Sequence, residues 1–169
     1  MPDVVRDPVH RVRYAFTPEG DDVLVDCWLE PGARLPEHRH PRQEEEWWVV
    51  EGSARVTLDG KARTMVPADG VLLVRAHARH ALASAGPGEA HLRCRVRPAL
   101  GLQAFLTESA AGAREGLIRT GGIPRSLRGA RWGAELLARH GDDVVMSFPP
   151  PPVQRAMVAL LGRRGGRAG

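Results

Sequence analysis

The stretch from residue 32 to residue 52, GARLPEHRHPRQEEEWWVVEG, holds two histidines separated by a single residue, His38 and His40, followed by three consecutive glutamates. Residues two apart on a β-strand point to the same side, so both imidazoles can face one point inside a barrel. A turn after Pro41 would bring the carboxylate of Glu45, on the next strand, to the same point. The stretch therefore predicts a site built on two neighbouring strands.

A further histidine can reach this point from the segment that begins at Asp69 and ends at His80. His38, His40, Glu45 and His80 then offer three imidazoles and one carboxylate. Such a mixed set suits Fe, Mn, Ni, Cu or Zn better than Mg or Ca. We therefore expect one divalent transition metal as cofactor. Four protein ligands around an octahedral ion leave two positions for water, a substrate or dioxygen.

At these residues the chain resembles the cupin superfamily. The first motif of that family is a glycine, five residues, H-x-H, three or four residues, a glutamate, six residues and a glycine. The matching residues are Gly32, His38, His40, Glu45 and Gly52. The resemblance covers roughly residues 20–97 and implies that the two histidines and the glutamate are metal ligands.

The second motif of the family is a proline, one residue, a glycine, two residues and a histidine, and it is met only in part. His80 holds the histidine position, but Arg75 stands in place of the proline and His77 in place of the glycine. His77 is therefore an alternative to His80 as the fourth ligand.

Short apolar runs separated by turn residues fill the chain from His10 to Arg97, as expected for many short strands. Asp59 and Gly60 lie between two such runs and predict a tight hairpin, because both residues tolerate positive φ. Apolar and polar residues alternate from Ala90 to Arg97, which indicates a strand with one buried face. We predict a mainly β fold, a cupin-like double-stranded β-helix or jelly-roll barrel.

After Pro98 apolar residues such as Leu102, Phe105 and Leu106 recur near helical spacing, which predicts two or three C-terminal α-helices. The last would begin after the proline run 149–152, because proline suits a first helical turn. We expect a barrel domain at residues 1–98 and a helical extension at residues 99–169 that ends in a disordered basic tail. The helices would pack on the barrel or against a second copy of the chain.

Composition and charge restrict the classes of partner. The 169 residues carry a net charge of +4, but 23 arginines and one lysine are scattered along the chain, so we expect no nucleic-acid partner. No apolar run approaches the roughly 20 residues of a membrane span, and no signal peptide is recognisable. We expect a cytoplasmic homodimer that binds a small molecule and no membrane. Cys27 and Cys94 are expected to be buried thiols.

Three side chains are candidates for the wall of a substrate pocket: Trp47, His77 and Glu37. Trp47 lies two residues after Glu45 and should share its inward face. His10, along with His91 and His140, lacks a partner in the pattern and is interpreted as structural.

Two functions fit these features. In the first, the protein is a metal-dependent enzyme, oxygenase-like or isomerase-like, that acts on a small polar organic molecule, with His77 or Glu37 moving protons. In the second, it is a non-catalytic small-molecule binding or sensing cupin in which the metal is structural or absent. One barrel hosts many chemistries, so the fold does not choose between them.

Overall fold

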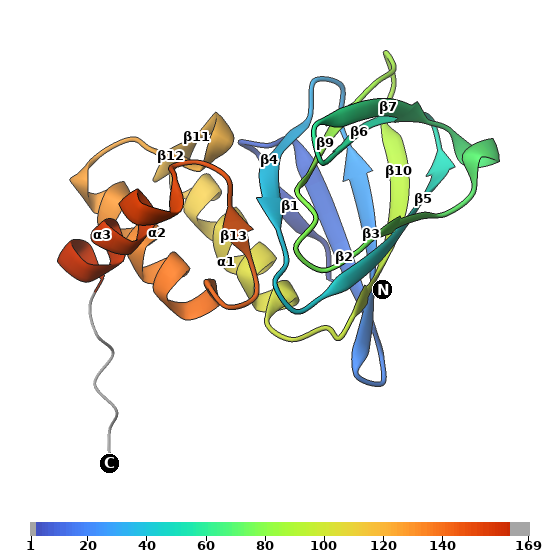
Figure 1. Cartoon of the computed structure of the whole chain (residues 1–169). Coiled ribbons are helices and arrows are strands. Elements are labelled where there is room, and N and C mark those ends of the chain that lie inside the picture. Colours follow the sequence, from blue (N-terminus) through green and yellow to red (C-terminus); the bar gives the residue numbers. More distant parts are fainter. Residues whose placement is uncertain (1–2, 163–169) are drawn as a thin grey trace.

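The computed structural model describes residues 3–162, which form a jelly-roll β-barrel and three helices beside it (Figure 1). The larger antiparallel sheet has the strand order β1 (Val5–Asp7), β2 (Val12–Glu19), β3 (Asp22–Leu29), β10 (Ala90–Arg97), β5 (Glu44–Glu51) and β8 (Leu72–Val74). The smaller has the order β13 (Val145–Met146), β4 (Arg34–Arg39), β9 (His80–Ser84), β6 (Ala54–Leu58) and β7 (Lys61–Met65). The predicted mainly β, double-stranded β-helix fold is confirmed. The basic tail predicted after the last helix lies outside the described residues.

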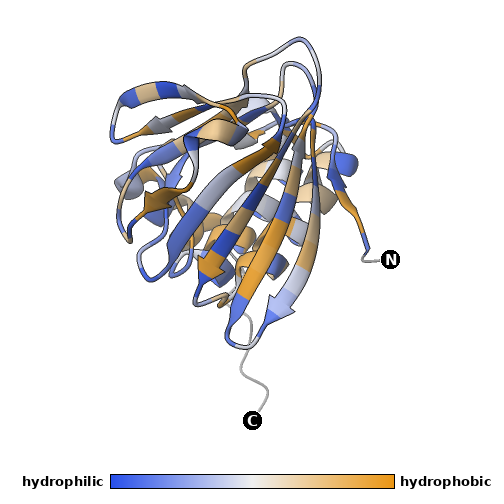
Figure 2. Ribbon diagram, turned by 90° about the vertical axis from the view of Figure 1, so that its right-hand side faces the viewer, coloured by the Kyte–Doolittle hydropathy of each residue, from blue (hydrophilic) through white to orange (hydrophobic). Residues whose placement is uncertain are grey.

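Strand β10 shows how an alternating sequence forms a wall of the barrel. It pairs with β3 on one side and β5 on the other, and its alternate residues Ala90, Leu92, Cys94 and Val96 are buried. Hydrophilic and hydrophobic residues accordingly alternate along the strands of this sheet (Figure 2). The predicted alternation is confirmed, and Cys27 joins Cys94 as a second buried free thiol.

The outward face of β10 carries an ion-pair ladder. Arg93 pairs with Asp26 of β3, and the two arginines that follow at alternate positions pair with carboxylates of β2, β3 and β5. Exposed pairs of this kind contribute little to stability each. Their effect is to leave this face with few unpaired positive charges.

The hairpin of β6 and β7 turns at Asp59 and Gly60, whose φ angles are 47° and 79°. Both values lie in the left-handed region that a two-residue turn of this type requires. The hairpin predicted at this position is confirmed.

The helices are α1 (Leu102–Arg114), α2 (Leu127–His140) and α3 (Pro151–Leu161), and the last begins inside the proline run, two residues earlier than predicted. A two-stranded ribbon of β11 (Ile118–Arg119) and β12 (Ile123–Pro124) separates the first two. Short 3-10 turns occupy Pro67–Asp69 and Thr120–Gly122. No helix within residues 3–162 has the length and apolarity that crossing a membrane requires.

The segment between α2 and α3 returns to the barrel, which the sequence did not predict. It forms β13, in which Val145 pairs with Arg39 and Met146 pairs with His38 (Figure 1). The C-terminal part of the chain therefore supplies an edge strand of the smaller sheet, directly beside the H-x-H pair.

Helices α1 and α2 approach closely at a single glycine. Gly112 of α1 is buried, and a methyl group at this position would overlap the ring of Trp132 on α2. Gly133, in the interior of α2, has no atom within 4 Å of a would-be methyl group.

We therefore predict that Gly112→Ala lowers the free energy of unfolding by about 1–3 kcal/mol, because the helices must separate or Trp132 must shift. Gly133→Ala is the matched control and should raise it by up to about 1 kcal/mol, since alanine is the better helix former. Urea unfolding of both variants measures the difference. Equal effects would contradict this account of the packing.

Candidate metal centre

Three histidines meet at one end of the smaller sheet. His38 lies on β4, His40 follows at its end, and His80 begins β9 opposite His38 in the register of the two strands. Their candidate ligand nitrogens all lie within 4.8 Å of one another. The pairing of β4 with β9 shifts register between Leu35 and His38, so Leu35 also faces the interior.

Each of the three rings is held by a backbone carbonyl that accepts a hydrogen bond from its Nδ1. A carbonyl oxygen only accepts, so in the neutral ring Nδ1 carries the proton and Nε2 keeps a free lone pair. Hydrogen bonds of this kind orient histidines in metal sites. The three Nδ1–oxygen distances are 2.9 Å for His38 with Pro36, 3.0 Å for His40 with Asp143, and 3.2 Å for His80 with Ala78.

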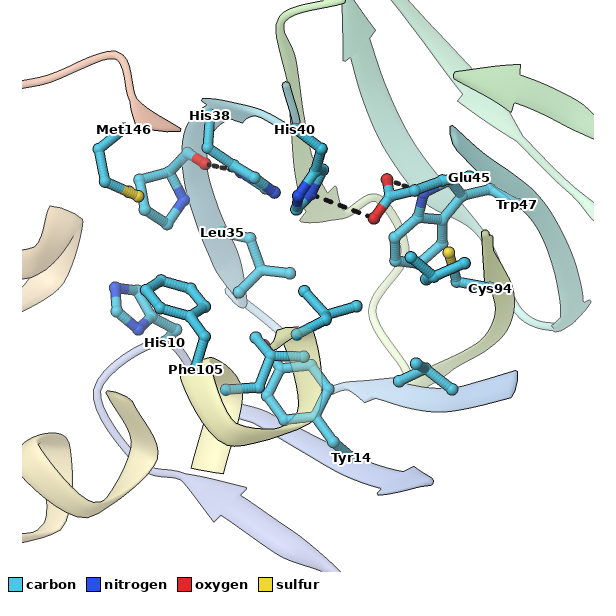
Figure 3. Close-up of a pocket in the computed structure, with 15 residues that line it drawn as sticks. His10, Tyr14, Leu35, His38, His40, Glu45, Trp47, Cys94, Phe105 and Met146 are labelled. Carbon is cyan, nitrogen blue, oxygen red and sulfur yellow. Dashed lines mark hydrogen bonds and ion pairs between the residues drawn. The ribbon is translucent and has the colours of Figure 1, made fainter. Parts of the chain in front are cut away.

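Glu45, on β5 of the other sheet, brings a buried carboxylate to the same place (Figure 3). Its oxygens lie 3.2 Å from Nε2 of His40 and 3.1 Å from Nε2 of His80. Neither contact is a hydrogen bond, since both nitrogens lack a hydrogen-bond partner among residues 3–162. Buried lone pairs that face a carboxylate without bonding to it fit a cation placed between them.

The electrostatics favour the protonation state that a metal ion needs at His38 and Glu45, whereas His40 is more readily protonated as long as no metal ion is bound. Burial and the neighbouring rings of His80 and His40 hold the pKa of His38 well below 6.5, so this ring is neutral at pH 7. Burial raises the pKa of Glu45, but His40 and His80 outweigh it and bring that pKa well below its usual value. Burial lowers the pKa of His40, yet the Glu45 carboxylate raises it by more.

The structure brings His80, and not His77, to His38 and His40. The side chain of His77 is exposed, and its backbone N–H donates to the carbonyl oxygen of His40 at 2.8 Å. Its φ of 68° lies in the left-handed region, which explains why glycine is usual at this place in the family motif. His77 is therefore not part of the group of histidines that the structure brings together.

A cavity of about 80 Å³ adjoins the histidines. Trp47 lines it and donates its indole N–H to Glu45 at 2.8 Å. The other two pocket candidates, Glu37 and His77, are not among the lining residues of this cavity. Most of the wall is aliphatic or aromatic (Figure 3). Besides the metal candidates and Trp47, its lining residues are His10, Tyr14, Val25, Leu35, Pro36, Cys94, Val96, Leu102, Phe105, Leu106 and Met146.

The C-terminal part of the chain closes this cavity. Helix α1 contributes three of its apolar residues, and β13 contributes Met146. Phe105 and Met146 also line a second apolar cavity of about 290 Å³ between α2, α3 and the β11–β12 ribbon. The helical spacing of Leu102, Phe105 and Leu106 indicated an apolar face, but no sequence signal indicated that this face would meet the metal site.

Comparison with known proteins agrees with this architecture. Residues 26–94 match the family model described as the cupin domain. The chain therefore contains a cupin domain over these residues. A curated relative, polyketide synthase CurC of Streptomyces cyaneus, is 37% identical over 70 residues, which make up 41% of this chain and 45% of the relative. The aligned part of this chain thus covers less than half the length of that relative.

Two solved structures share the fold of this cupin. An RmlC-like cupin from Shewanella frigidimarina aligns with a TM-score of 0.51 and 23% identity over 59% of this chain and 86% of its own. A conserved protein with a double-stranded β-helix domain from Klebsiella pneumoniae aligns with a TM-score of 0.50 and 22% identity over 57% of this chain and 84% of its own. At such identities the likeness establishes the barrel alone.

The raised pKa of His40 predicts a pH dependence of stability in the metal-free protein. The folded state keeps a proton that the unfolded state releases above pH 6.5, so the free energy of unfolding should fall as pH rises above 6.5 and be lower at pH 8 than at pH 6.5. Glu45→Gln removes the charge that raises this pKa and should abolish the fall. Urea unfolding at both pH values measures it.

Glu46→Gln is the matched control, because Glu46 pairs with Arg95 and Arg97 on the outer face. This variant should keep the wild-type fall. A fall of the same size in the Glu45 and Glu46 variants would contradict the assignment of the effect to the buried carboxylate.

Proposed function

We propose that this cupin binds one divalent transition metal ion through His38, His40, Glu45 and His80 and uses it to hold a small, largely apolar molecule. One observation carries the proposal. The three imidazoles all direct their Nδ1 protons to backbone carbonyls, which leaves the Nε2 atoms, two of them buried, close together beside a carboxylate. A cluster kept only for packing would not need to withhold every Nε2 from hydrogen bonding.

The donor set fits Fe, Mn, Ni, Cu or Zn, because neutral imidazoles and one carboxylate suit these ions better than Mg or Ca. A metal ion bound there would supply a Lewis acid that polarises an oxygen donor of the ligand. The protein fixes the geometry around it. Trp47 holds the Glu45 carboxylate through its indole N–H, and the backbone carbonyls hold the rings.

The composition of the cavity wall favours a less polar ligand than the sequence led us to expect. A small polar molecule was expected, but outside the metal candidates the wall is mostly carbon, so the apolar body of a ligand would contact it and a few polar groups would orient it. The relative named as a polyketide synthase supports such a ligand, because polyketides are carbon frameworks that carry oxygen donors. Larger ligands would extend past Phe105 and Met146 into the second cavity.

The metal proposal predicts the effect of single substitutions on metal content. Protein purified without added metal and then dialysed against Zn²⁺ should hold about one ion per chain. His80→Ala should lower the affinity by at least the roughly 10- to 100-fold that loss of an outer hydrogen-bond partner costs. Elemental analysis after exhaustive dialysis measures the content.

His77→Ala is the matched control for this measurement, since His77 lies three residues before His80 and is exposed. It should retain the wild-type metal content. Equal metal content in the wild type and His80→Ala, or loss in His77→Ala alone, would contradict the proposed ligand set.

The ligand class predicts which compounds stabilise the metal-loaded protein. Phenols should raise its melting temperature, because they combine an apolar ring with an oxygen donor, whereas sugars should not. His80→Ala should respond less to the same phenols. A larger shift with sugars than with phenols would contradict an apolar ligand.

Oxygen consumption by the Fe(II)-loaded protein, measured with the same compounds, distinguishes an oxygenase from a non-catalytic binding protein. Consumption that depends on an added phenol would identify an oxygenase. Stabilisation without consumption or conversion of the compound would identify a non-catalytic binding protein.

A further inference from the structure

The turn between β1 and β2 holds a buried pair of titratable side chains that the proposed metal site does not use. The ring Nδ1 of His10 lies 2.8 Å from one carboxylate oxygen of Asp7, and both side chains are about 5% exposed or less. The other oxygen of Asp7 accepts the backbone N–H groups of Val9 and His10 at 2.9 Å and 3.0 Å. The backbone of the turn thus holds the Asp7 carboxylate in place, and the carboxylate in addition orients the His10 ring.

This arrangement decides which nitrogen of His10 carries the proton. Burial raises the pKa of Asp7, but its hydrogen bonds with His10 outweigh burial and lower that pKa, so the carboxylate is ionised at neutral pH. An ionised carboxylate only accepts, so Nδ1 is the donor. In the neutral ring, Nε2 then keeps its lone pair and acts as a hydrogen-bond acceptor.

That acceptor is buried and has no hydrogen-bond partner among residues 3–162. Buried polar atoms are nearly always bonded, and an unbonded one costs free energy. His10 also lines the cavity that adjoins the metal histidines (Figure 3). A histidine that served only to brace the turn would need Nδ1 alone and would have no reason to contribute to the cavity wall.

We infer that His10, held by Asp7, is a second polar anchor of the cavity and that its Nε2 accepts a hydrogen bond from a hydroxyl group of the bound molecule. The inference rests on the proposed function in one respect, which is that the cavity binds a small molecule. It adds the substrate class, a hydroxylated aromatic compound of the phenol type. Because Nε2 accepts, the anchor selects against molecules that have a methyl group in place of the hydroxyl.

Phenol and toluene test this inference, because they differ in little but the exchange of a hydroxyl for a methyl group. The dissociation constants of both are measured by NMR titration with metal-free protein, so phenol cannot be held by a metal ion. His10→Asn keeps a side-chain nitrogen that can donate to Asp7 but lacks Nε2. The preference for phenol over toluene should fall by about fivefold in this variant, the value of one hydrogen bond.

His91→Asn is the matched control, since His91 is hydrogen-bonded to Asp26 and does not line the cavity. It should keep the wild-type preference, and His10→Asn should keep the wild-type metal content. An unchanged preference in a folded His10→Asn protein would overturn the inference. So would a failure of the wild type to bind phenol.

The ¹⁵N resonances of the histidine rings in the wild type provide a second measurement that does not depend on the variant's folding. Phenol should shift an unprotonated Nε2 resonance that toluene leaves in place, and that resonance should be missing from His10→Asn if this variant folds. Absence of any such shift would overturn the inference. Because these measurements use metal-free protein, their outcome is distinguishable from a failure of the proposed metal site, which metal content reports separately.

Discussion

Hydrogen bonds from three imidazole Nδ1 atoms to backbone carbonyls are the constraint on which the candidate metal centre depends. For His38 and His80 the carbonyl belongs to the residue two positions earlier in the chain, so the local backbone orients these two rings. The third comes from Asp143, more than a hundred residues after His40. Without these bonds the rings could bond through Nε2 to the nearby Glu45, and the lone pairs that suit a metal ion would be lost.

The dependence of His40 on Asp143 makes the C-terminal part of the chain a component of the site. Arg42 bonds to the Asp143 carboxylate at 2.6 Å, which ties the turn after the H-x-H pair to the segment before β13. Buried Gln154 of α3 donates to the carbonyls of Met146 and Pro149 and so holds the other end of β13. The same segment lets Met146, together with Phe105 of α1, form the wall of the cavity. The helices therefore shape the space in which a ligand would meet the metal.

The sequence predicted the parts of this site that depend on local spacing. His38 and His40 could be placed because strand alternation and the distance to Glu45 are short-range patterns. The choice between His77 and His80 could not be made, because it depends on the backbone turning through a positive φ at residue 77. A strand as short as β13 has no period to detect, so its pairing was missed. His10 was interpreted as structural because its role depends on a cavity that α1 completes only in the folded chain.

The cavity unites these features, since its mostly apolar wall is interrupted at one place by the metal candidates and at another by His10. The central claim is that the histidines and Glu45 surround one metal ion. An anomalous difference map from crystals of the zinc-loaded protein tests it most directly. We predict a single strong peak about 2.0–2.1 Å from Nε2 of His38, His40 and His80 and within ligand distance of Glu45. No peak at this position, or a peak held by other residues, would contradict the account.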